Sequence, residues 1–280
     1  SDKLDTKSYY FFFKHSAYII LAIMILIMFS FLNQKILTKF SLILFLIAFL
    51  SLLLVPFLGV EVKGSKRWLD LVFLPRFQPV EIIKPFFVVT LSLILTIQSR
   101  KLYFKYFLST LLILPILLLL VYQPDIGQTL LTSMVWLAII FVSGINIFVF
   151  FIFFFLVGSV LTYLVIFVSK FEYIKIRLLA FLDSSSGNNY QAEKASDAII
   201  NGGFFGKGIG EGTLNSRVPE AHTDYIVSVI AEEFGAIIVI GILLLYLIFS
   251  YKIIQKIKVL NEDTLKLILI GCVSMILLQT

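Results

Sequence analysis

The stretch that decides the fold is residues 147–169, IFVFFIFFFLVGSVLTYLVIFVS, which carries no charged side chain. About 20 predominantly apolar helical residues suffice to cross the hydrocarbon core of a bilayer. A helix is suited to that environment because it satisfies its own backbone hydrogen bonds where no water can. This stretch therefore predicts a transmembrane helix.

Seven further apolar stretches flank it. They predict spans at 16–32, 40–58, 80–98, 107–122, 128–148, 225–251 and 265–280. The polar residues 143–146 interrupt an apolar run too long for one crossing, so we predict two crossings there. The fold class is thus an all-α polytopic membrane protein with about eight transmembrane helices. Because the last run is still apolar at Thr280, we expect the chain to be part of a longer protein.

The composition agrees with this class and excludes a soluble enzyme. Hydrophobic residues make up 60% of the chain and charged residues 14%, against about 45–50% and 25% in soluble domains. One cysteine, Cys272, and two histidines, His15 and His222, provide neither a disulfide framework nor a zinc cluster. The net charge of +6 indicates loops near anionic lipid first and an anionic ligand second, and we expect no nucleic-acid partner.

Two loops are candidates for function. Residues 170–224 form a long loop rich in Gly, Ser and Asn, and residues 59–78 form a shorter loop that carries Lys66 and Arg67. A loop as long as 170–224 is usually functional or disordered. Four predicted spans separate the two loops, so both are expected on the same side of the membrane. The basic residues of the short loops are nearly balanced across the membrane and orient the chain only weakly.

Charged residues occur inside two predicted spans. Glu81 and Lys84 are three residues apart, which places them on one helix face where they can pair. Two interpretations stay open: a structural ion pair near the interface, or a pair that lines a polar cavity for substrate. Glu232 and Glu233 lie about two turns into the span at 225–251, where they require partners or a cavity.

Two further motifs each allow two interpretations. In QPDIGQ, residues 123–128, Asp125 is placed to cap the following helix, and it can instead face the same pocket as Glu81. In NGGFFGKGIGEG, residues 201–212, the glycines indicate a flexible loop or a backbone nest for an anion.

The end of the long loop, VPEAHTDYI at residues 218–226, gathers Glu220, His222 and Asp224 where the chain re-enters the membrane. Thr223 or Asp224 there can simply cap the next helix. A carboxylic acid partly shielded from water also has a raised pKa, which suits a general base. His222 has no histidine or cysteine companion for a metal site.

Taken in order, these motifs resemble the SEDS family (shape, elongation, division and sporulation), polytopic membrane glycosyltransferases. The resemblance covers essentially the whole chain. It rests on GSKRWL at 64–69, QP at 78–79 with Glu81 and Lys84, QPDIG at 123–127, YQ at 190–191, the glycine loop, PEAHTDY at 219–225 and AEEFG at 231–235. Three shorter segments, EVKG at 61–64, KP at 84–85 and GEGT at 210–213, are more similar to the division member of the family than to its elongation member.

The resemblance implies a ten-helix fold, and residues 1–280 would form a single transmembrane domain that contains about eight of those helices. It also implies an enzyme that polymerises lipid II into peptidoglycan glycan strands. It places loops 59–78 and 170–224 outside the cytoplasm, the second as the carrier of the catalytic motif. The family's essential aspartate falls on Asp224, our candidate general base. The expected substrate-binding residues are Lys66, Arg67, Glu81, Lys84, Gln191, Arg217, Glu220, His222 and Thr223.

The resemblance also implies partners and a location. The ligands would be lipid II and an undecaprenyl-pyrophosphate-linked glycan, and the partners a class B penicillin-binding protein transpeptidase and other divisome membrane proteins. A divalent cation, Mg or Mn, can be held by Glu81, Glu220 and Asp224. The location would be the bacterial cytoplasmic (inner) membrane at the septum. Two other functions stay open, a lipid II flippase and a division-complex scaffold.

Overall fold

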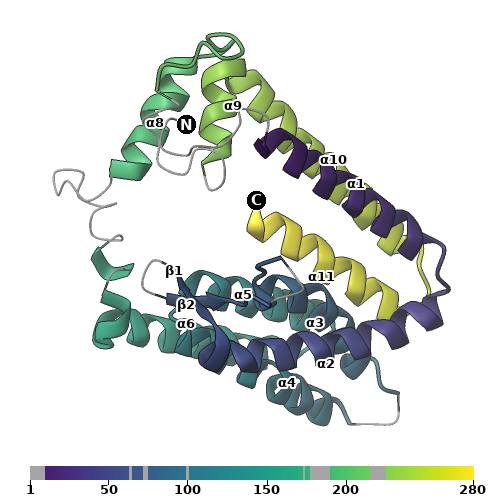
Figure 1. Ribbon diagram of the computed structural model, residues 1–280. Helices are drawn as coiled ribbons and strands as arrows, with labels where there is room; N and C mark the ends of the chain where they lie inside the picture. Colours follow the sequence, from purple (N-terminus) through teal and green to yellow (C-terminus); the bar gives the residue numbers. More distant parts are fainter. Residues whose placement is uncertain are drawn as a thin grey trace.

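A computed structural model describes residues 10–62, 65–71, 75–98, 101–172, 174–176, 190–214 and 225–280. The fold is all-α, as predicted, with one short hairpin (Figure 1). The elements in chain order are α1 (Tyr10–Ser30), α2 (Gln34–Leu58), β1 (Val60–Val62), β2 (Ser65–Trp68), α3 (Pro79–Leu95), α4 (Leu102–Tyr122), α5 (Ile126–Val142), α6 (Ile147–Phe167), the 3-10 turn η1 (Ser169–Phe171), α8 (Tyr190–Gly202), α9 (Ile226–Phe234), α10 (Ala236–Val259) and α11 (Asp263–Gln279).

Helix lengths fit a membrane protein. Among the described residues, α1, α2, α4, α6 and α10 are long and apolar enough to cross a bilayer by themselves. Helices α3, α5 and α11 have 17 residues each, about 25 Å at 1.5 Å per residue. The predicted break at 143–146 is confirmed, because α5 ends at Val142 and the Asn146 side chain caps α6 by accepting the amide of Phe148.

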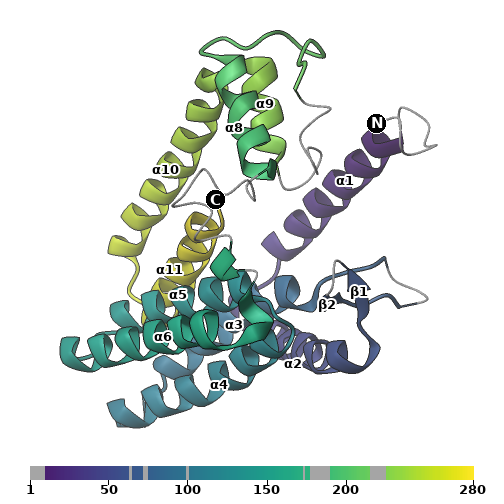
Figure 2. The same cartoon turned by 90° about the vertical axis from the view of Figure 1, so that its left-hand side faces the viewer.

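The core lies where α3 and α5 meet α2, α4 and α11. Its fully buried side chains come from α2 (Leu52), α3 (Phe87, Leu91), α4 (Ile116, Leu120) and α5 (Ile139, Ile140). Gly271 lets α11 approach closely, since a Cβ there would lie 2.5 Å from Val88 Cγ1 and 2.7 Å from Ile139 Cδ1. Helices α1 and α10 overlap in Figure 1 but diverge from each other in Figure 2, so neither covers the other.

The span predicted at 225–251 is wrong as a single helix. It is split at Gly235 into α9 and α10, and Gly235 has a φ of 83°, a conformation that ends a right-handed helix. The long loop also contains a helix that the sequence reading did not predict, α8, which packs against α9 (Figures 1 and 2).

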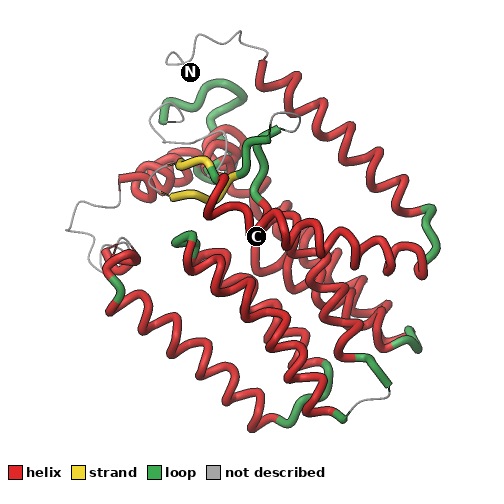
Figure 3. Tube along the Cα trace, turned by 60° about the horizontal axis from the view of Figure 1, so that its bottom comes forward, coloured by secondary structure: helices red, strands yellow, loops and turns green. Residues whose placement is uncertain are grey.

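Both candidate loops begin at one end of the bundle, as the number of intervening spans predicts. In the shorter loop, strands β1 and β2 form an antiparallel hairpin (Figure 3), and Arg67 of this hairpin contacts the α4–α5 turn. At the start of the long loop, Lys170 of η1 donates to the carbonyl of Tyr122, at the end of α4, at 2.6 Å. The opposite end holds Gln34 against Glu262 at 2.7 Å. We call the first of these ends the loop end.

Candidate functional site

A charged pair on α3 begins the site at the loop end. Lys84 Nζ lies 2.7 Å from Glu81 Oε2, and the Lys84 side chain is 5% exposed against 40% for Glu81. Gln128 of α5 joins both, because its amide oxygen accepts from Lys84 at 3.2 Å and its amide nitrogen donates to Glu81 at 2.6 Å. Gln279 of α11 donates to Glu81 Oε2 at 3.3 Å. The predicted pairing of Glu81 with Lys84 is therefore present, and two other helices complete it.

Asp125 extends the network to the α4–α5 turn. It caps α5 by accepting the amide of Gln128 at 3.3 Å, and its other oxygen accepts from Gln78 at 3.2 Å. Arg67 Nε lies 3.7 Å from the same oxygen. Burial raises the pKa of Asp125 above its ordinary value, while the Arg67 charge and the Gln128 hydrogen bond oppose that rise. The predicted cap is therefore confirmed, and Asp125 also joins the hydrogen bonds around Glu81 and Lys84 through Gln128.

Arg67 ties the hairpin to this turn. Its Nε donates to the carbonyl of Gln123 at 3.4 Å, and its Nη2 donates to the carbonyl of Pro124. The guanidinium that we predicted to bind substrate is thus already engaged by groups of the protein. We call Arg67, Gln78, Asp125, Gln128, Glu81, Lys84 and Gln279 the loop-end network.

Beside the network lies a hollow of about 310 Å³. Lys66 and Lys170 bring two ammonium groups to it and Glu61 one carboxylate. Lys170 also lies 4.8 Å from the ring centre of Tyr122. The sequence reading missed Lys170, although its position as the first residue of the long loop was a usable signal. The remaining lining residues are Pro56, Ser65, Tyr122, Gln123 and Pro124.

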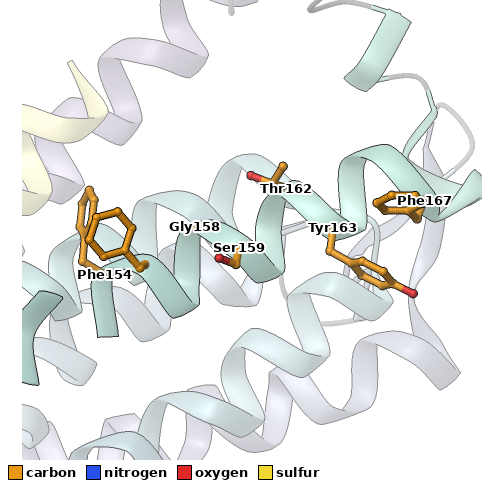
Figure 4. Close-up of a pocket in the computed structure, with 7 residues that line it drawn as sticks. Phe154, Gly158, Ser159, Thr162, Tyr163 and Phe167 are labelled. Carbon is orange, nitrogen blue, oxygen red and sulfur yellow. The ribbon is translucent and has the colours of Figure 1, made fainter. Parts of the chain in front are cut away.

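A second, larger hollow of about 450 Å³ lies along α6 (Figure 4). Gly158, Ser159 and Thr162 form its floor between aromatic rings such as Phe154 and Phe167. Among the described residues, no carboxylate, amine or guanidinium lines it. It therefore lacks the groups that acid, base or phosphate chemistry requires.

Main-chain hydrogen bonds hold two central amides of the glycine loop, so these two amides are not open to an anion. Lys207 N donates to the carbonyl of Glu232 at 2.9 Å, and Gly208 N donates to that of Glu233 at 3.0 Å. These amides are consequently occupied. Gly206 has a φ of 80° and passes so close to α9 that a Cβ there would overlap the Glu233 carbonyl oxygen.

Several predicted site residues lie outside the described residues: Arg217, Glu220, His222, Thr223 and the candidate base Asp224. Gln191 belongs to α8, and only its backbone is described. Of the three carboxylates named for a Mg or Mn ion, Glu220 and Asp224 lie outside the described residues, and Glu81 is engaged by Gln128, Lys84 and Gln279. Within the described part of the chain, no three His, Cys, Asp or Glu residues come together as a metal site.

The long apolar helices and the charged network at one end of their bundle define a polytopic membrane protein with a polar network at that end. A family model described as cell cycle protein, for FtsW, RodA and SpoVE, matches residues 1–280. The chain belongs to this family, which is the SEDS family that the sequence motifs predict.

Three relatives are each named probable peptidoglycan glycosyltransferase FtsW. The protein of Haemophilus influenzae is 31% identical over 273 residues, which are 94% of this chain and 67% of that protein. That of Coxiella burnetii is 34% identical over 250 residues, which are 85% of this chain and 65% of that protein. That of Caulobacter vibrioides is 29% identical over 242 residues, 83% and 59%. The chain therefore spans about three fifths to two thirds of these relatives, and their names confirm its similarity to the division member.

Two solved structures share the fold. One belongs to a study of how a peptidoglycan synthase complex coordinates polymerisation and crosslinking, with a TM-score of 0.75, 25% identity, and coverage of 95% of this chain and 76% of that one. The other is the rod shape determining protein RodA of Thermus thermophilus, with a TM-score of 0.67, 22% identity, and coverage of 95% and 72%.

Proposed function

We propose that the full-length protein is a peptidoglycan glycosyltransferase that polymerises lipid II in the bacterial cytoplasmic membrane at the division septum. The observation that carries the proposal is the loop-end network, which fixes the shorter loop and three core helices around a buried Lys84. The names of the three relatives support the reaction class, and so does the similarity to a chain of a peptidoglycan synthase complex.

In the proposed reaction, Asp224 is the general base. Lipid II presents an anomeric carbon joined through an α-linked oxygen to a polyprenyl pyrophosphate. Growth of a β-1,4 strand inverts that carbon, so the acceptor hydroxyl attacks from the opposite face. Asp224 takes the hydroxyl proton as the new carbon–oxygen bond forms. The bond to the pyrophosphate breaks, and its electron pair leaves with that group.

The leaving pyrophosphate requires cations. Lys66 and Lys170 line the hollow beside the loop-end network and Arg67 does not, so we assign the leaving group to the two lysines. Lys170 also donates to the carbonyl of Tyr122. Arg217 is a third cation by its position in the sequence. Gln191, Glu220, His222 and Thr223 keep the substrate-binding role that the resemblance implies, while Glu81 and Lys84 hold α3, α5 and α11 together.

The network favours polymerisation over flipping. A flippase requires polar groups that a substrate can reach from both sides of the membrane. Beyond Lys84, the described buried side chains of α3 are apolar except for Thr90 and Ser92, whose hydroxyls donate to carbonyls of their own helix. A pure scaffold has no use for a general base and would tolerate the loss of Asp224.

The test is polymerisation of fluorescent lipid II by the full-length protein together with its proposed partner, a class B penicillin-binding protein transpeptidase. Wild type is compared with Asp224→Asn and with the control Asp70→Asn, which removes an exposed carboxylate that pairs with Arg76 at 2.9 Å. We expect glycan product from wild type and Asp70→Asn, and at least about a hundredfold less from Asp224→Asn with lipid II binding retained. Equal product from Asp224→Asn would refute its role as base. Absence of product from wild type with partner bound would favour the flippase or the scaffold.

A further inference from the structure

Glu232 of α9 is a completely buried carboxylate with an unusual set of partners. Its side chain is 0% exposed, and one oxygen, Oε1, accepts three hydrogen bonds of 2.9 Å each. The donors are Nδ2 of Asn201 at the end of α8 and the backbone amides of Thr213 and Leu214. The other oxygen, Oε2, is buried and has no partner among the described residues.

Such an arrangement is costly unless it has a task. A buried carboxylate oxygen without a hydrogen bond loses its hydration without compensation. An apolar side chain would fill the space in α9 without that loss, but it could not accept the amides of Thr213 and Leu214. The three bonds on one oxygen identify Glu232 as the point where α8, α9 and the end of the glycine loop are joined.

The joint lies beside the segment that carries the candidate base. Residues 215–224 run from Leu214, which Glu232 holds, to Tyr225, the N-cap residue of α9. Leu214 and Tyr225 both pack against Ala195 and Ala198 of α8. Both ends of the segment are therefore seated on one face of α8, and Glu232 supplies the polar bonds of the first end.

We infer that Glu232 is a positioning residue that holds the chain at the start of residues 215–224 and thereby orients Asp224. The inference rests on the proposed function, since Asp224 is the base of that reaction. The partners of the Glu232 side chain are Asn201, Thr213 and Leu214, so we assign it a positioning role and not a catalytic one. It acts through the amides of Thr213 and Leu214, so its loss slows turnover and leaves lipid II binding in place.

The experiment compares Glu232→Leu with Glu232→Gln in the full-length protein in lipid nanodiscs with its partner. Leucine has a similar size and accepts no hydrogen bond, whereas glutamine keeps an acceptor oxygen for all three donors. The control is Asp197→Asn, which removes an α8 carboxylate that is half exposed and pairs with Lys194 at 2.9 Å. Amide hydrogen exchange of Thr213 and Leu214 and polymerisation of fluorescent lipid II are both measured.

For Glu232→Leu we expect exchange at the two amides to rise by at least about tenfold, because their acceptor is gone. We expect kcat to fall by about a hundredfold with KM within about threefold, the size of effect that a 1 Å misplacement produces. Glu232→Gln and Asp197→Asn should remain within about threefold of wild type in both measurements. If Glu232→Leu does not accumulate in the membrane, Asn201→Leu removes one of the three donors and should produce a smaller change in the same direction.

Three results would overturn the inference. Unchanged amide hydrogen exchange at Thr213 and Leu214 in Glu232→Leu would show that Glu232 does not anchor these two residues. A raised KM with unchanged kcat would identify Glu232 as a substrate-binding residue. A loss of kcat in Glu232→Gln equal to that in Glu232→Leu would show that the charge of Glu232 is required and not the hydrogen bonds it accepts. A wild type without polymerisation would instead refute the proposed function and with it any role in that reaction, while the exchange data would still decide the anchoring.

Discussion

The pair of Glu81 and Lys84 should be energetically coupled and asymmetric. Loss of one partner of a buried pair costs about 3–5 kcal/mol, whereas exposed pairs contribute about 0.2–1 kcal/mol. Here Lys84 is 5% exposed and Glu81 40%. Glu81→Gln therefore leaves a buried ammonium with Gln128 as its remaining acceptor, and we expect a loss of about 2 kcal/mol in the free energy of unfolding.

Lys84→Met should cost less, about 1 kcal/mol, because the half-exposed Glu81 keeps Gln128 and Gln279 as donors. In the double variant no buried charge is left, so its cost should also be about 1 kcal/mol, which makes the coupling energy about 2 kcal/mol. The assay is SDS-induced unfolding in mixed micelles, followed by the fluorescence of Trp136, which is buried in α5.

The control for this cycle is a second pair with the same spacing, Asp263 and Lys266 on α11, also in contact at 2.9 Å. Its side chains are 78% and 34% exposed, so Asp263→Asn should cost at most about 0.5 kcal/mol. Additive costs for Glu81→Gln and Lys84→Met, within about 0.5 kcal/mol, would show that the pair is not coupled. A larger cost for Lys84→Met than for Glu81→Gln would refute the burial argument.

Three further predictions concern stability in the same assay. Gly271→Ala should destabilise the protein by about 1–2 kcal/mol, because its Cβ would overlap Val88 and Ile139. The control Gly241→Ala in α10 has open space around it and should stabilise by about 0.5 kcal/mol. Equal effects of the two substitutions would contradict the close packing of α11 at Gly271. The folded-state pKa of Asp125 is raised above 3.8, so folding disfavours its ionisation. Stability should therefore fall as pH rises from about 4 through the folded-state pKa. Asp125→Asn should abolish this pH dependence. Gly206→Ala should destabilise by at least about 2 kcal/mol more than Gly210→Ala. Both glycines have a positive φ, but only at Gly206 would the added Cβ overlap backbone atoms of α9. Similar losses of stability would show that the positive φ alone accounts for the destabilisation.

The sequence predicted those features that are local in the chain. The spacing of three between Glu81 and Lys84 was enough to predict their pairing, and the position of Asp125 before an apolar run was enough to predict its cap. The partners from other helices, Gln128 and Gln279, could not be predicted, because hydrophobic periodicity says which face of a helix is buried but not at what height two helices meet.

The α9–α10 junction shows the same limit. Glu232 and Glu233 inside an apolar run were predicted to need partners or a cavity, but the break at Gly235 was not predicted. Two of the three donors to Glu232 are the backbone amides of Thr213 and Leu214, and any residue type except proline has such an amide. Side-chain patterns therefore could not identify them.

The intrahelical pairing on α3 also bears on how the chain enters the membrane during synthesis. A charged residue raises the cost of inserting a helix, by up to about 2.5–3.5 kcal/mol when it lies at the helix centre. Glu81 and Lys84 neutralise each other within one turn of α3, so the helix carries its own counter-charge when it leaves the ribosome. Gln128 and Gln279 are made only later, with α5 and α11. Helix α3 can thus move into lipid before α5 and α11 arrive, and the order of synthesis becomes compatible with a charged bundle interior.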